Sequence, residues 1–224
     1  MPVNHPSIPS SRSGISFSAG RFQQAFILSA FLIGLCLTGA GCSQPPAESP
    51  YSTCPSGDCI TYTDGIGQKV EIPRHPQRII SLAPNVTETL YLLGAQDRLI
   101  GNTIQCTWPE ASRHKPKIGD LLNPNYEKIL AAKPDLVIAS TAGNDRAAVM
   151  KLVKLGIPVY VIAPRSVEMI LQCVEDMGRI TDCADKGLQL AAQMRERLDK
   201  VTQHIAGMSP VRAFFITWFE TGMV

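Results

Sequence analysis

The sequence predicts an α/β fold with a mainly parallel β-sheet, and two observations support this. Four short runs of apolar, β-type residues recur along the chain, with helical segments between them; the runs are residues 78–83, 98–103, 135–140 and 158–163. Strands that alternate with helices are typical of parallel βαβ units. The second observation is a much longer amphipathic segment at residues 182–204. We therefore expect a Rossmann-like lobe followed by a long spine helix of about 33 Å.

The first expected elements are a hairpin and a strand. Asp64-Gly65 is a turn signal between β-type residues, which predicts a β-hairpin over residues 61–72. The buried-strand run at 78–83 follows and stops at Pro84.

A helix is expected to begin at Asn85. Asn85 and Glu88 have the spacing of a capping box, and Gly94 ends the helical pattern. The second strand then covers residues 98–103.

The next helix is expected to open at Asn123-Pro124, because proline suits the first helical position. It stops before Pro134, and the strand at 135–140 follows. A further helix covers residues 145–155 and ends at Gly156.

After the strand at 158–163, Ser166 is expected to cap a helix that runs to about Ile180. The long helix then starts at Asp182. Near the end, the apolar run at 211–219 predicts a strand, which we interpret as the first strand of a second lobe in a truncated chain.

Composition narrows the class of protein. The chain has 224 residues, of which 45% are hydrophobic and 18% charged, and its formal net charge is +2. This composition suits a packed domain and not a disordered chain. A chain so close to neutral offers no long basic face, so we expect no nucleic-acid partner.

The N-terminal region is typical of an export signal. A leader whose only charges are Arg12 and Arg21 precedes the apolar run at 25–37, and small residues then lead to Cys42. The run is too short for a membrane span, which needs about 20 residues. The TGAGC sequence resembles a bacterial lipobox, which implies cleavage and lipidation at Cys42, although Gly39 stands where leucine is usual. The alternative is a plain secreted protein.

These observations divide the chain into five parts. We expect a signal peptide (1–41), a lipidated flexible tether (42–60), an N-terminal α/β ligand-binding lobe (61–181), a long linking helix (182–207) and the start of a truncated second lobe (208–224).

Export changes the interpretation of the cysteines. Cys54 with Cys59 and Cys173 with Cys183 are close pairs, and disulfides persist in oxidising compartments. Each pair is expected to form either a structural bridge or two free thiols. Zinc is a third alternative, although no histidine lies near either pair.

The expected parallel sheet predicts where a ligand binds. Open parallel sheets bind ligands beyond the carboxyl ends of their strands. The residues expected there are Pro84, Asn85, Gln105, Cys106, Thr107, Trp108, Leu121, Ser140 and Asn144. Asn85 could instead be a simple helix cap. Trp108 could stack on a flat macrocycle or pack on its own lobe, and Cys106 could ligate a metal centre or pack as a small hydrophobe.

From the hairpin onwards, the sequence resembles a known family. The run DGIGQKVEIPRHPQRIISLAPNVTE (64–88) is similar to the opening of ABC-importer substrate-binding proteins for vitamin B12, ferric siderophores and haem. The resemblance continues through CTWPEA (106–111), NPNYE (123–127) and KPDLV (133–137) to LGIPV (155–159). It covers residues 61 to about 205.

The resemblance implies two α/β lobes joined by one long helix, with the ligand in the cleft between them. It implies a bound chelate of cobalt or iron and no other cofactor. The implied partners are an inner-membrane ABC permease with its ATPase. The chain would be held at the membrane by its lipid and face the periplasm or the cell exterior.

Two further implications concern single residues. In the family, a glutamate at the position of Glu127 pairs with permease arginines; otherwise Glu127 is a solvated first-turn residue. Members that bind B12 carry aromatic side chains where this sequence has Gln105, Leu121 and Ser140, which argues against B12 itself.

Three other interpretations compete. A direct zinc or manganese binder needs converging histidines, but His75, His114 and His204 lie away from the strand ends. An exported enzyme is disfavoured because the chain has no GxSxG, HExxH or phosphate-loop motif. The third is a remnant that retains half a cleft and binds nothing.

Overall fold

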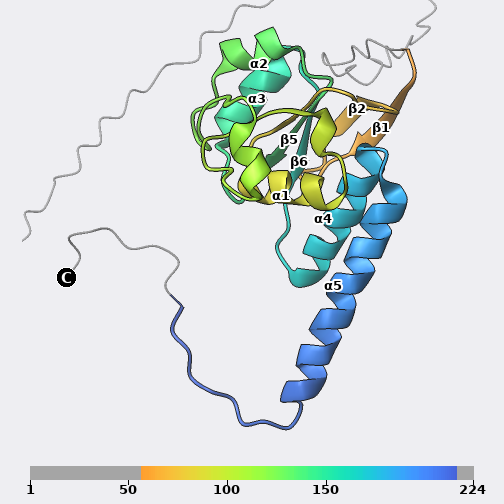
Figure 1. Ribbon diagram of the computed structural model, residues 1–224, viewed down its shortest axis with the longest axis vertical. Helices are drawn as coiled ribbons and strands as arrows, with labels where there is room; N and C mark the ends of the chain where they lie inside the picture. The colour runs from red at the N-terminus through yellow and green to blue at the C-terminus, as the bar shows by residue number, and fades with distance from the viewer. Residues whose placement is uncertain (1–56, 216–224) are drawn as a thin grey trace, which may run out of the picture. The chain divides into compact units, whose positions relative to one another are not determined.

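The structure, a computed structural model, describes residues 57–215 (Figure 1). The predicted signal peptide, Cys42, Cys54 and most of the predicted tether lie outside the described residues. The strands are β1 Cys59–Thr63, β2 Lys69–Pro73, β3 Ile79–Ser81, β4 Leu99–Asn102, β5 Leu136–Ser140 and β6 Val159–Ile162. The helices are α1 Pro84–Leu92, α2 Tyr126–Ala132, α3 Arg146–Lys154, α4 Val167–Ile180 and α5 Ala184–Ile205, with short 3-10 turns η1 Gln96–Arg98 and η2 Glu110–His114.

The central sheet is parallel and has the order β4-β3-β5-β6. This confirms the predicted α/β fold. The hairpin is also confirmed, since β1 and β2 pair antiparallel beside the sheet. The chain runs from β3 outward to β4, then returns past β3 to β5 and continues to β6. A topological switch point therefore lies between β3 and β5, where a crevice is expected at the carboxyl ends.

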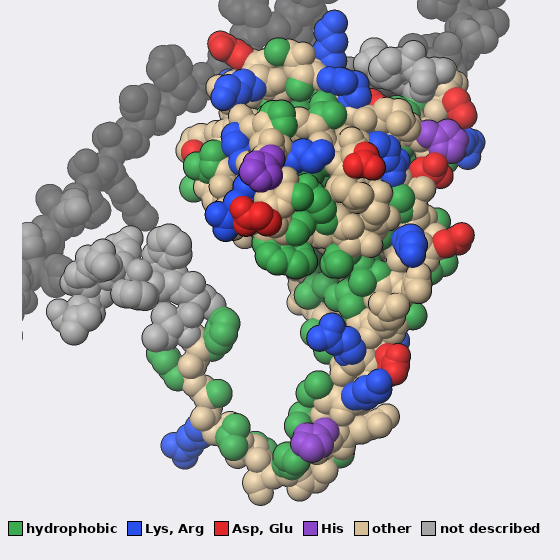
Figure 2. Space-filling view, viewed as in Figure 1, with side chains coloured by type: hydrophobic (Ala, Val, Ile, Leu, Met, Phe, Trp, Pro, Cys, Tyr) green, Lys and Arg blue, Asp and Glu red, His purple; other side chains and the backbone are tan. Residues whose placement is uncertain are grey.

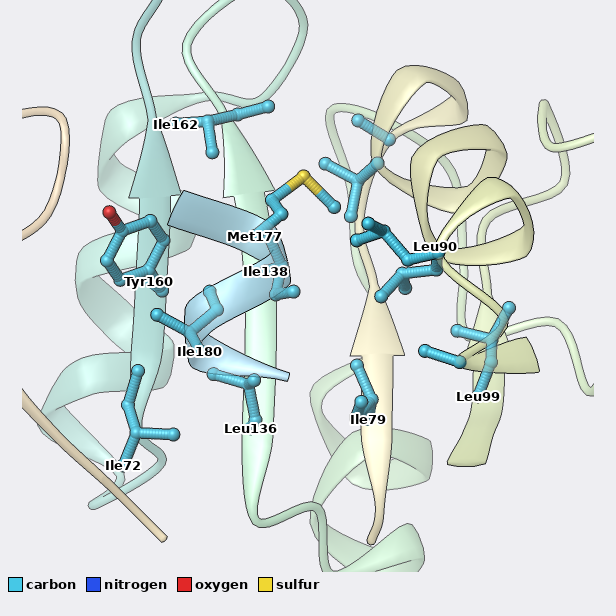
Figure 3. Close-up of a cluster of buried hydrophobic side chains, with 14 of the residues drawn as sticks. Ile72, Ile79, Leu90, Leu99, Leu136, Ile138, Tyr160, Ile162, Met177 and Ile180 are labelled. Atoms are coloured by element: carbon cyan, nitrogen blue, oxygen red, sulfur yellow. The ribbon is translucent and has the colours of Figure 1, made fainter. Parts of the chain in front are cut away.

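Helices cover both faces of the sheet. Successive residues of a strand point to opposite faces, so each apolar strand contributes to two cores. One core packs beneath α1 and α4, as Figure 3 shows; it includes Ile79, Leu90, Leu136, Ile138, Tyr160, Met177 and Ile180. The other packs beneath α2 and α3; it includes Ile80, Ile129, Val137, Ala139, Val149 and Leu152.

Two helix starts differ from the sequence prediction. The N-cap of α1 is Ala83, without a side-chain bond, and Pro84 occupies the first turn. Proline is preorganised for that position, so the helix begins one residue before Asn85. The predicted Asn85 cap is therefore wrong.

The second difference is at α2, which begins at Tyr126 and not at Pro124. The Asn125 side chain caps it by accepting a hydrogen bond from the Lys128 N–H at 2.9 Å. Residues before Asn125 are held in a turn instead, because Asn125 N donates to Ile118 O and Gly119 pairs with Pro124.

The two C-terminal helices agree with the prediction. Ser166 caps α4, accepting from the Met169 N–H, and α5 spans 22 residues. The helices cross at Gly178 and Gly187, where a Cβ added to either would lie about 3 Å from the backbone of the other. Larger side chains at these two positions would push α4 and α5 apart.

The predicted strand at 211–219 is not found in its described part. Residues 211–215 form no strand, and Val211, Phe214 and Phe215 are exposed. A strand needs backbone partners, and none of the described residues pairs with this segment. Within residues 57–215, no helix has the length and apolarity needed to cross a membrane.

The cysteines separate into two states. Cys59 is disulfide-bonded, and its predicted partner Cys54 lies outside the described residues. Cys173 and Cys183 are free thiols, the second of the two predicted alternatives. Cys183 accepts a hydrogen bond from Arg98 at 3.2 Å, and burial raises the pKa of Cys173.

Candidate functional site

The switch point brings together the residues that follow β3 and β5. Asn85, in the first turn of α1, donates its side-chain amide to the Ser140 hydroxyl at 3.4 Å. Asn85 is exposed, whereas Ser140 is buried at the end of β5. Pro84 is half-buried beside them. This contact and the pairing of β3 with β5 place the carboxyl ends of the two strands side by side, and we call the surface around them the switch-point surface.

Asn144 joins this surface to the loop 119–123. Its side-chain oxygen accepts from Ser140 N at 2.8 Å, and its amide donates to Leu82 O at 2.9 Å and Leu121 O at 2.8 Å. The side chain thus satisfies backbone groups of three segments. These hydrogen bonds of Asn144 are all with backbone groups, and its predicted place at the ligand surface stays a prediction.

The loop 119–123 is shaped by a second local interaction. Asp120 accepts from the N–H groups of Leu122 and Asn123 at 2.8 and 2.7 Å, and the hydrogen bonds from Asn123 and Leu122 lower its pKa. Leu121 is half-buried against the core, and Gly143 leaves room for its side chain. Leu122 remains exposed on this loop.

The loop after β4 presents several exposed side chains. Gln105 and Thr107 are exposed, and Trp108 is 57% exposed. Ile104 N donates to Gly119 O at 3.0 Å, which places this loop beside the loop 119–123.

Cys106 lies in the core and not at the ligand surface, so its burial agrees with the second of its two predicted roles, packing as a small hydrophobe. It is 0% exposed, with Sγ 3.2 Å from the hydroxyls of both Thr87 and Thr103. Thr87 also donates to Ser81 at 2.8 Å. The thiol turns inward because this hydroxyl cluster gives it partners in the core.

Lys117 anchors the same loop and was missed in the sequence. Its ammonium group donates to Asn102 Oδ1 at 2.7 Å and to the carbonyl oxygens of Thr103, Cys106 and Ser112 at 3.2–3.3 Å. Burial lowers the pKa of Lys117. A single lysine between Pro116 and Ile118 carries no recognisable sequence signal, since its role depends on where four oxygens converge.

Glu127 lies in the first turn of α2. It is exposed and has no hydrogen-bond or ion-pair partner among the described residues. In the described part of the chain, no group of three or more His, Cys, Asp or Glu residues is arranged to hold a metal ion.

Comparison with known proteins adds a decisive observation. The pattern of the family described as periplasmic binding protein matches residues 79–224, more than half of the chain. The chain belongs to the periplasmic binding protein family. That family consists of binding proteins, which agrees with the prediction of a protein that is not an enzyme.

Three relatives illustrate the likeness. A vitamin B12-binding protein of Vibrio vulnificus (strain CMCP6) is 32% identical over 139 residues, covering 62% of this chain and 51% of the relative. The solved periplasmic vitamin B12 binding protein of Vibrio cholerae is 31% identical with a TM-score of 0.57, covering 61% of this chain and 53% of that one. The haem-binding protein of Roseiflexus sp. RS-1, in apo form, is 25% identical with a TM-score of 0.54, covering 60% and 52%.

This periplasmic binding protein therefore spans about half the length of the curated relatives it matches. The match includes β3 to α5 and with them the whole switch-point surface.

Proposed function

We propose that this chain is the capture component of an ABC importer, which binds a metal chelate of cobalt or iron and delivers it to a permease and its ATPase. The observation that carries the proposal is the switch-point surface between β3 and β5, in a chain of the periplasmic binding protein family. Relatives named for binding vitamin B12 and haem support a bulky chelate as the ligand class.

The proposal includes the placement of the chain in the cell. The export signal and the small residues before Cys42 support a lipid-anchored protein that faces the periplasm or cell exterior. Residues 182–207 act as the linking helix, and residues 208–224 begin a second lobe. Pro84, Asn85, Gln105, Thr107, Trp108 and Leu121 contribute to the ligand surface, and the buried Ser140 holds Asn85 by its hydrogen bond.

The capture function is tested with the full chain and three probes: cyanocobalamin, haemin and ferric citrate. We expect saturable binding of at least one probe by absorbance titration. In this proposal the described residues supply only one wall of the ligand cleft, so the Kd is expected to be on the order of 100 µM. If none of the three probes binds at millimolar concentration, the result would favour the alternative that the chain is a remnant with half a cleft that binds nothing.

A matched pair of variants locates the binding surface. Trp108→Ala is expected to weaken probe binding about five- to tenfold, because it removes the exposed aromatic ring that would stack on the ligand. Leu92 has a similar exposure of 55% but lies at the C-terminal end of α1, so Leu92→Ala should have no effect on binding. Equal effects of the two changes would contradict the assignment.

Glu127 is proposed to dock on the permease. Glu127→Arg should leave probe binding within twofold of the wild type, because the side chain is exposed and makes no ion pair in the described part. It should abolish the stimulated uptake of ligand into vesicles that contain the cognate permease and ATPase, since it places an arginine opposite the permease arginines. Glu196→Arg on α5 serves as the control. Unchanged uptake by the Glu127 variant would contradict docking.

A further inference from the structure

A hollow of about 890 Å³ lies beside the switch-point surface, towards the β6 edge of the sheet. We call it the hairpin pocket. Its lining includes Gly65 and Gln68 of the hairpin, Ser140 and Asn144 at the end of β5, and Arg146 and Arg165. Ser140 and Asn144 also belong to the switch-point site, so the two are continuous.

The hairpin turn closes one side of this pocket by direct contact with β6. Gly65 N donates to Val161 O at 2.7 Å. A Cβ at position 65 would lie 2.6 Å from Ala163 N, so only glycine permits this approach. The Gln68 side chain reaches Met150 Sδ at 3.5 Å across the adjoining wall.

The walls combine apolar and polar side chains, and the charged lining residues are both arginines, Arg146 and Arg165. Both are exposed, and neither has a hydrogen-bond or ion-pair partner among the described residues. Their situation differs from that of Arg179, which pairs with Glu175 and Asp176.

The nearby carboxylates are already engaged in local structure. Asp145 caps α3 by accepting from Ala148 N at 2.9 Å. Asp64 is buried inside the hairpin turn, where one oxygen accepts from Ile66 N and Gln68 N, and the other has no partner. Burial raises the pKa of Asp64.

The backbone adds to the positive potential from the arginines. Arg146 is the first residue of α3, and Arg165 directly precedes Ser166, the N-cap of α4. Helix N-termini carry partial positive charge and favour anions. The same pocket therefore combines two guanidinium groups, two helix starts and apolar side chains.

We propose that the hairpin pocket is a subsite for an oxyanion, a carboxylate or a phosphate, attached to an apolar part of the captured ligand. Guanidinium groups bind such oxyanions with paired hydrogen bonds. The inference rests on the proposed capture function and narrows it: the cargo is an anionic chelate and not a neutral one.

The subsite is tested in the full chain with citrate, inorganic phosphate and the neutral trimethyl ester of citrate. Binding is followed by amide chemical shifts of Gly65, Gly67 and Thr141 in ¹⁵N–¹H spectra. We expect citrate or phosphate, but not the ester, to shift these signals. Preference for citrate identifies carboxylate-bearing cargo, and preference for phosphate identifies phosphorylated cargo.

Charge-removal variants complete the test. Arg146→Gln and Arg165→Gln should each raise the Kd for the preferred anion about tenfold, and their combination should abolish the shifts. Arg197→Gln removes an exposed arginine of α5 that also lacks a partner in the described part, and it should change nothing. No anion binding, or binding that the double variant retains, would overturn the subsite.

The two proposals fail in different ways. If citrate or phosphate binds through the arginines while cyanocobalamin, haemin and ferric citrate do not, the subsite is supported and the capture of these chelates is not. If a chelate binds with the same Kd in the wild type and the double variant, capture is supported and the subsite is overturned.

Discussion

Replacing Gly187 by valine is expected to lower the free energy of unfolding by about 3 kcal/mol, the upper end of overpacking costs. A Cβ at this position would lie 3.0 Å from Gly178 Cα and 3.1 Å from Val174 O. Both obstacles are backbone atoms, so relief requires α4 and α5 to move apart. The apolar side chains between them, including Leu171, Val174 and Ala191, would then lose contacts.

Urea denaturation of the full chain measures this effect, and Ala192→Val provides the control. Ala192 is exposed on the same helix, so its replacement should cost less than about 1 kcal/mol through helix propensity alone. Gly187→Ala should also destabilise, although the same change at an open helical position would stabilise by about 1 kcal/mol. A stabilising Gly187→Ala would show that the helices do not cross at this glycine pair.

Replacing Asn144 by alanine is expected to destabilise the chain by about 3 kcal/mol. The change removes three hydrogen bonds, each of which typically contributes about 1 kcal/mol, and it leaves Ser140 N without its partner. Because the same side chain holds Leu121 O, the loop 119–123 should also lose its position. Probe affinity should fall more than stability alone would predict.

Hydrogen exchange and urea denaturation test both parts of this expectation. Amides of residues 119–125 and 140–145 should exchange faster in the variant, whereas those of the α4–α5 contact should be unchanged. Asn123→Ala is the control, since that side chain is exposed and makes only long contacts with Asp120. Equal stability of the two variants would contradict the structural role of Asn144.

Several of the large apolar side chains that this chain exposes lie together on one face of α4 and α5. Val167, Ile170, Leu198 and Val201 are exposed where the helices leave the sheet, and Figure 2 shows hydrophobic side chains gathered there. Val167, Ile170, Leu198 and Val201 border a shallow hollow of about 440 Å³ with Leu171, Met194 and Arg197. These positions follow the helical period, so their apolar character was readable in the sequence, whereas their exposure was not.

The regular elements were predictable because their signals are local. Apolar runs such as 135–140 and 158–163 identify buried parallel strands, since both faces of the sheet are covered. Ser166 identifies the start of α4 because its hydroxyl satisfies a backbone group three residues away. The predicted starts of α1 and α2 lie one and two residues from the observed starts, because the competing signals at Pro84, Asn85, Pro124 and Asn125 are equally local.

The sequence by itself determined the alternation of strands and helices and the resemblance to the family, and it predicted the edge of the sheet at which we propose the site. Only the tertiary structure decided which side chains face outward at that edge. Cys106 turns inward because Thr87 lies 19 residues away in sequence but 3.2 Å away in space. Asn144 and Leu82 meet across 62 residues, and Arg146 joins the hairpin pocket with Gly65. Such contacts depend on how the whole chain folds back on itself, so no local sequence pattern predicts them.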